Sequence, residues 1–184
     1  MKTYRQMSAG LYKVNILISK VEECLIAVSM AVLTAVMTYQ VITRYFLGIA
    51  APWAEELCRY LFIWTSYIGG AYALLRWEHI EIDLIDTIIS KKVKDPARTM
   101  WYMKKITILM VVAYLIHFIS VYYSYIQQVA SFGQISAALK INMLIPMYSG
   151  IVGLGLMIFH GITLLIMPPE PTDNLGPKKE ENAQ

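Results

Sequence analysis

Charged residues are missing from long stretches of this sequence. No Asp, Glu, Lys or Arg lies between Glu23 and Arg44, between Arg59 and Arg76, from residue 106 to 139, or from 141 to 169. The chain is 57% hydrophobic and only 16% charged, which excludes a disordered protein and favours a membrane protein. A bilayer core about 30 Å thick needs about 20 mostly apolar helical residues per span. The segments that meet this requirement are about 24–43, 57–75, 106–126 and 143–167.

Cysteine and histidine are also scarce, at two and three residues. Cys24 and Cys58 begin spans at opposite membrane faces, too far apart for a disulfide. His117 and His160 lie within spans and leave open a haem-binding membrane anchor of an electron-transfer complex. However, their expected heights, about 18 Å and about 10 Å above the face where the chain ends, are unequal. No nucleophile–base pattern or metal-ligand spacing occurs, so we expect neither an enzyme nor a cofactor.

The spans also lack the features by which transporters mark a substrate route. Ion- and proton-coupled carriers usually place ionisable residues in mid-membrane, and many contain matched pairs of broken helices. Neither feature is present. A stand-alone small transporter is therefore a weaker hypothesis than a subunit that acts with a partner.

The basic residues predict how the chain is oriented. Four precede the first span, seven lie between the second and third, two follow the fourth, and three lie on the other side, which accounts for all 16. We therefore expect both termini to be cytoplasmic. Residues 1–167 would form one four-span domain, and 168–184 a disordered tail. Residues 1–23 would either lie on the membrane surface or extend the first span.

The loop between spans two and three contains an amphipathic pattern at 78–89. Leu84 and Ile88 share its apolar side, and His79 and Asp83 are one turn apart and able to pair. The pattern predicts a helix lying in the membrane interface. The expected fold is thus all-α: four transmembrane helices with an interfacial helix between spans two and three.

Small residues in spans two and four allow helices to approach closely, because packing drives helix association in membranes. Such contacts join either this chain's own helices or a partner's. The candidate packing residues are Ser66, Gly69, Gly70 and Gly153.

A cluster of charges stands at the start of span two. Glu55 and Arg59 are four residues apart and can pair along the helix. Glu56 points elsewhere, and we expect it to meet Arg44 at the end of span one. Trp53 would be an interfacial anchor beside them. The cluster is either a self-contained ion network or part of a partner interface.

The residues that carry a family resemblance surround this cluster. Segment 53–85, WAEELCRYLFIWTSYIGGAYALLRWEHIEIDLI, together with TRYFLG before it and SAALKINMLIPMYSG near span four, is similar to the small permease (Q) subunit of tripartite ATP-independent periplasmic (TRAP) transporters. The resemblance covers about residues 15–167.

The resemblance implies a scaffold role in the bacterial inner membrane. In this family a large membrane subunit carries organic acids, such as dicarboxylates or sialic acids, together with sodium. A periplasmic substrate-binding protein delivers the substrate. The small subunit braces the large one and helps to dock the binding protein. The implied partners are these two proteins and the lipid bilayer, without nucleic acid, and nothing in the sequence selects the substrate.

Overall fold

The computed structural model of this chain describes residues 2–75 and 96–166. The predicted interfacial helix 78–89 and the predicted tail 168–184 lie outside the described residues. His79, Asp83, Leu84 and Ile88 are therefore not placed.

The described residues form an all-helical fold, as predicted. Its helices are α1 (Lys2–Phe46), α2 (Pro52–Leu75), α4 (Pro96–Ser131) and α5 (Leu144–Ile166). Prolines begin α2 and α4, where the missing N–H removes no helical hydrogen bond. After α1 the chain turns at Gly48, whose φ of 65° suits glycine. The Thr43 carbonyl accepts hydrogen bonds from the amides of Leu47 and Ile49 there.

Helix α1 is continuous over 45 residues. At 1.5 Å per residue it is about 68 Å long, roughly twice the thickness of a bilayer core. Residues 2–23 therefore extend the first span, which was one of the two alternatives left open by the sequence. This extension carries Asn15 and Glu22 alongside the far end of α5.

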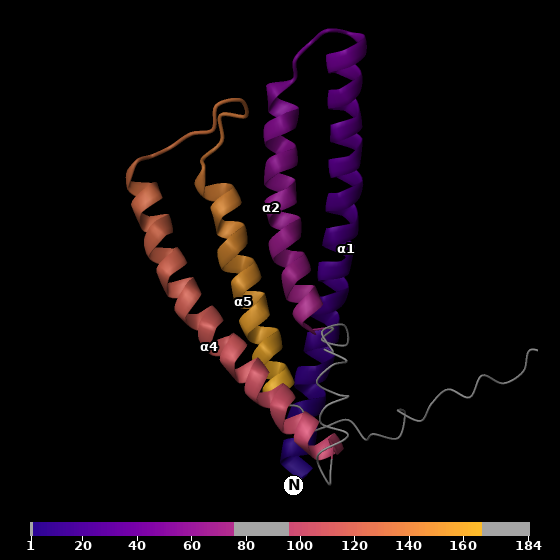
Figure 1. The fold of residues 1–184 in the computed structure, drawn as a ribbon, viewed down its shortest axis with the longest axis vertical. Coiled ribbons are helices and arrows are strands. Elements are labelled where there is room, and N and C mark those ends of the chain that lie inside the picture. Colours follow the sequence, from indigo (N-terminus) through magenta and orange to yellow (C-terminus); the bar gives the residue numbers. More distant parts are fainter. Residues whose placement is uncertain (1, 76–95, 167–184) are drawn as a thin grey trace, which may run out of the picture.

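The helices lie in the spatial order α1, α2, α5, α4, with α2 packed on both α1 and α5, and α5 packed on both α2 and α4 (Figure 1). We call the end with segments 47–51 and 132–143 the connection end. The opposite end, where α1 begins and α5 finishes, is the terminal end. The bundle spreads toward the connection end and narrows toward the terminal end (Figure 1).

Two of the four predicted packing residues make close helix contacts. A Cβ on Gly153 would lie 2.6 Å from Cβ of Tyr67 and 2.9 Å from its backbone, and one on Gly70 would lie 2.5 Å from the Met157 methyl carbon. Both glycines thus hold α2 against α5. Gly69 has open space where a Cβ would be, and Ser66 is exposed. These two do not pack within the described chain.

Three helical segments are long and apolar enough to cross a membrane: Lys13–Phe46, Tyr102–Ser131 and Leu144–Ile166. Helix α2, which contains the predicted span 57–75, is not among them. In the most apolar part of Lys13–Phe46 no residue is buried within the chain. The structure therefore contains membrane-spanning helices, and α1 turns most of its surface outward.

Candidate functional site: the connection end

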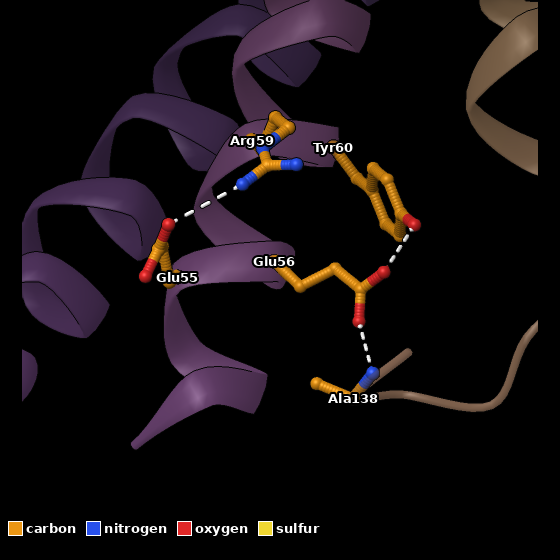
Figure 2. Close-up of polar contacts among 5 residues, drawn as sticks. All are labelled: Glu55, Glu56, Arg59, Tyr60 and Ala138. Carbon is orange, nitrogen blue, oxygen red and sulfur yellow. Dashed lines mark hydrogen bonds and ion pairs between the residues drawn. The ribbon is translucent and has the colours of Figure 1, made fainter. Parts of the chain in front are cut away.

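Glu55 and Arg59 form the ion pair that their spacing predicts. Nη2 of Arg59 lies 3.3 Å from Oε1 of Glu55, and both side chains are 64% exposed (Figure 2). Water screens a pair of this kind, so it contributes at most about 1 kcal/mol to stability. The pair therefore adds little to the stability of the fold, but both side chains are accessible to a partner.

Glu56 points away from this pair and reaches the loop between α4 and α5 (Figure 2). Its Oε1 accepts a 2.5 Å hydrogen bond from the Tyr60 hydroxyl, and its Oε2 accepts bonds of 2.9 and 2.8 Å from the backbone amides of Ala138 and Leu139. One carboxylate thus joins the first turns of α2 to a loop about 80 residues later in the chain.

The expected pairing of Glu56 with Arg44 is wrong. Helix α2 lies between α1 and α5, and Glu56 occupies the side of α2 that meets the α4–α5 loop. Arg44, on α1, is exposed, and within residues 2–75 and 96–166 no ion pair or hydrogen bond of its side chain is recorded.

The hydrogen bonds at Glu56 favour its charged form. The bond from Tyr60, assisted by those from Leu139 and Ala138, lowers the pKa of Glu56 from 4.5 to about 2, although partial burial opposes this shift. Glu56 precedes the predicted span 57–75 and is ionised at neutral pH. It therefore acts as a fixed negative group that holds the loop.

The loop held by Glu56 is itself folded as a small hairpin, residues 134–143. The amide of Ser136 donates to the Ile141 carbonyl at 2.8 Å, and the amide of Met143 donates to the Gln134 carbonyl at 3.1 Å. Lys140 adopts a left-handed φ of 58° at the turn. Asn142 then caps α5, because its Oδ1 accepts the Leu144 amide at 2.9 Å. The hairpin is thus fixed at its base by α5 and near its tip by Glu56.

Large apolar side chains surround these polar groups. Trp53 is 42% exposed and lies against Tyr39, with ring centroids 5.6 Å apart. Other apolar residues at this end are more than 60% exposed: Tyr45, Phe46, Leu47, Ile49, Phe132 and Ile135. Large exposed apolar side chains next to charged groups are typical of an interface with lipid or protein.

One side of α2 continues this surface along the bundle. Glu55, Arg59, Phe62, Ser66 and Ala73 are exposed and spaced by four, three, four and seven residues, so they share one helix face. Neither α1 nor α5 covers this face. Between Ser66 and Ala73 its side chains are small.

The two histidines that left a haem anchor open do not form a ligand pair. His117 is exposed on α4. His160 is fully buried, with Nδ1 2.5 Å from Oδ1 of Asn15 and Nε2 3.0 Å from Oε1 of Glu22. Both nitrogens of His160 are occupied by side chains of α1, so the geometry does not favour haem binding. Within the described ranges, no three His, Cys, Asp or Glu side chains gather in a way that could hold a metal ion.

Comparison with known proteins decides the family. Residues 33–167 match the model for "Tripartite ATP-independent periplasmic transporters, DctQ component". The chain belongs to this family. As a DctQ component it is the small permease subunit of a TRAP transporter and a multi-pass membrane protein, as the resemblance at segment 53–85 implied.

A curated relative of this DctQ component is the sialic acid TRAP transporter small permease protein SiaQ of Vibrio cholerae serotype O1. The two are 38% identical over 82 residues, and the match covers 45% of each chain. The chain is therefore aligned with less than half of that relative's length.

Two groups of contacts could not be found from the sequence. Tyr60 is one helical turn after Glu56, a spacing that permits contact, but nothing in the sequence indicates that a carboxylate on α2 binds amides at 138 and 139. Asn15 and Glu22 are separated from His160 by 145 and 138 residues. The available signal was the seven-residue spacing of Asn15 and Glu22, which places both side chains on one face of the helix.

Proposed function

We propose that this subunit is a non-catalytic brace for the large transport subunit of a sodium-coupled TRAP transporter of organic acids. Family membership supports the large subunit as the partner, and the uncovered face of α2 is the main structural support for this proposal. Ser66 and Gly69 lie where no helix of the described chain packs, and small residues there would let a partner's helix approach closely. The exposed surface of α1 would share this interface or face lipid.

We further propose that the connection end lies in the periplasm and takes part in docking the substrate-binding protein. The excess of basic residues on the other side supports both termini being cytoplasmic and the location in the inner membrane. The folded hairpin held by Glu56 supports docking, because a rigid loop loses less conformational freedom on binding than a flexible one. The predicted helix 78–89 would set the depth of the subunit in the membrane.

The substrate is proposed from the relative. SiaQ of Vibrio cholerae is the small permease of a sialic acid transporter, so sialic acid is the first organic acid to test for this transporter.

A co-purification experiment tests the bracing role. A bulky residue on the uncovered α2 face, Ser66→Trp, should prevent the affinity-tagged small subunit from recovering the large one. Ala113→Trp is the matched control, because Ala113 is exposed on α4 and lies away from α2. Equal recovery of the large subunit by both variants would contradict the proposed interface.

A further inference from the structure

The strongest unassigned feature lies at the terminal end, where three polar side chains are buried together. His160 on α5 has no exposed surface, and Asn15 and Glu22 on α1 are each 2% exposed. Asn15 and Glu22 are seven residues apart, so they lie two turns apart on one face of α1. His160 contacts both and thereby joins α1 directly to α5. We call these three residues the buried polar triad.

The contacts restrict where the protons are. The amide oxygen of Asn15 lies 2.5 Å from Nδ1 of His160, and an oxygen can only accept, so Nδ1 carries a hydrogen. Nε2 lies 3.0 Å from Oε1 of Glu22, and one proton must lie between these two atoms. Either the ring is doubly protonated beside a carboxylate, or the carboxyl group is protonated and donates to a neutral ring.

The second oxygen of Glu22 distinguishes these two states. Oε2 is buried, and the described part of the chain offers it no hydrogen-bond donor. In a carboxylate this oxygen would carry half of a negative charge, and burying charge without a partner is costly. In a protonated acid the same atom is a neutral carbonyl oxygen, for which the loss of a partner costs much less.

Within residues 2–75 and 96–166, the neighbouring charges do not change this assignment. Helix α5 contains no Asp, Glu, Lys or Arg, and the charged residues of α2 (Glu55, Glu56, Arg59) all lie at the connection end. On α1, Lys20 and Glu23 are exposed. On α4, the ammonium group of Lys105 donates to the carbonyls of Leu164 and Leu165 at the end of α5.

Turning over the Asn15 amide would not provide a better alternative. Its nitrogen would then donate to Nδ1 of His160, and Nε2–H would donate to a Glu22 carboxylate. A carboxylate would then give the triad a net negative charge in an apolar interior, and a protonated Glu22 would instead leave its hydroxyl at Oε2 buried without an acceptor; both arrangements cost more than one in which every donor is paired.

We propose that the buried polar triad is an uncharged hydrogen-bond relay, in which protonated Glu22 donates to Nε2 of His160 and Nδ1–H of His160 donates to Asn15. The relay fixes α1 to α5 without placing a charge between the helices. Its members are positioning residues for the long α1. The inference concerns a joint within this chain and does not depend on the proposed function.

Infrared spectroscopy of the full chain in nanodiscs tests the proton on Glu22. We expect a carboxylic-acid C=O band at neutral pH that shifts on deuteration and disappears in Glu22→Gln. Glu23→Gln is the matched control, since Glu23 is the next residue and is exposed; it should leave the band unchanged. Absence of a band that depends on Glu22 would overturn the proposal.

Two further measurements separate the relay from a buried ion pair. In ¹⁵N NMR of histidine-labelled chain, the signals lost in His160→Gln should show a hydrogen on Nδ1 and none on Nε2; two protonated nitrogens would contradict the relay.

Thermal unfolding is the second measurement. Glu22→Gln should leave the melting temperature nearly unchanged, because an amide N–H can replace the acid as donor to Nε2. A large decrease would indicate that a negative charge had been removed from beside an imidazolium, and the relay would be wrong.

Discussion

Two glutamates, Glu56 at the connection end and Glu22 at the terminal end, join helices in opposite ways. Glu56 is only partly buried and accepts three hydrogen bonds through both oxygens. Glu22 is almost completely buried and has one contact through one oxygen. The same side chain is therefore suited to a charged state at one end and to a neutral state at the other.

The difference between Glu56 and Glu22 follows from where free backbone N–H groups are available. Inside a helix nearly every amide already donates to a carbonyl four residues earlier, so a side chain facing a helical bundle meets few free N–H groups. The tip of a hairpin has amides left over, and those of Ala138 and Leu139 bind Glu56. A glutamate between helices must instead be matched by another side chain, as Glu22 is by His160.

The largest effect is expected when the central residue of the buried polar triad is removed. His160→Ala should lower the free energy of unfolding by about 2–5 kcal/mol, because it leaves a cavity and deprives Asn15 and Glu22 of their partner. Thermal unfolding of the purified chain in detergent measures this. His117→Ala, at an exposed site, should change stability by about 0.5 kcal/mol or less. Similar losses in both variants would contradict a special role for His160.

A smaller effect is expected at Gly153. This residue lies on α5, the helix that follows the hairpin and carries His160. Gly153→Ala would press a methyl group against the Tyr67 backbone and should cost about 1–3 kcal/mol in thermal unfolding. Gly69→Ala provides the comparison, because its Cβ would meet nothing within 4 Å and alanine favours helix by about 1 kcal/mol. We expect Gly69→Ala to be neutral or stabilising. The opposite order would show that α2 and α5 approach elsewhere.

Most of the fold was accessible from the sequence because it depends on local patterns. The long uncharged stretches predicted a helix in each place where the described residues have one. Local spacing also gave the Glu55–Arg59 pair. The partner of Glu56 and the triad around His160 depend on how distant segments pack, which spacing does not encode. Arg44 was wrongly paired because it is near in sequence, whereas the hairpin is near in space.

Releasing the hairpin tests whether the Glu56 carboxylate holds it. A spin label at Ala137→Cys, with both native cysteines replaced by serine, reports mobility of the exposed loop tip. Glu56→Ala should make the label mobile at neutral pH, because Ala138 and Leu139 lose their acceptor. Glu55→Ala should not, since Glu55 contacts Arg59 and not the loop.

The same label gives the pH dependence of this attachment. The pKa of Glu56 is lowered to about 2 when the loop is bound, against 4.5 for an ordinary glutamate. The carboxylate therefore stabilises the bound loop fully above pH 4.5, and this stabilisation is lost as pH falls toward about 2. Electron paramagnetic resonance should show an immobile label from pH 7 to 5 and increasing mobility below that. Release near neutral pH would contradict a charged anchor.

The smallest effect on stability is expected at the exposed pair, and this makes it the most informative about partners. Arg59→Gln and Glu55→Gln should each change the free energy of unfolding by at most about 1 kcal/mol, because water replaces the lost contact. If the α2 face binds the large subunit, however, both charges become buried in the complex, where losing one partner costs about 3–5 kcal/mol. Each single variant should then impair co-purification and uptake while leaving the isolated chain stable. The double variant should be impaired less than the sum of the two, because residues in contact are not additive. Unchanged uptake in all three variants would place this pair outside the interface.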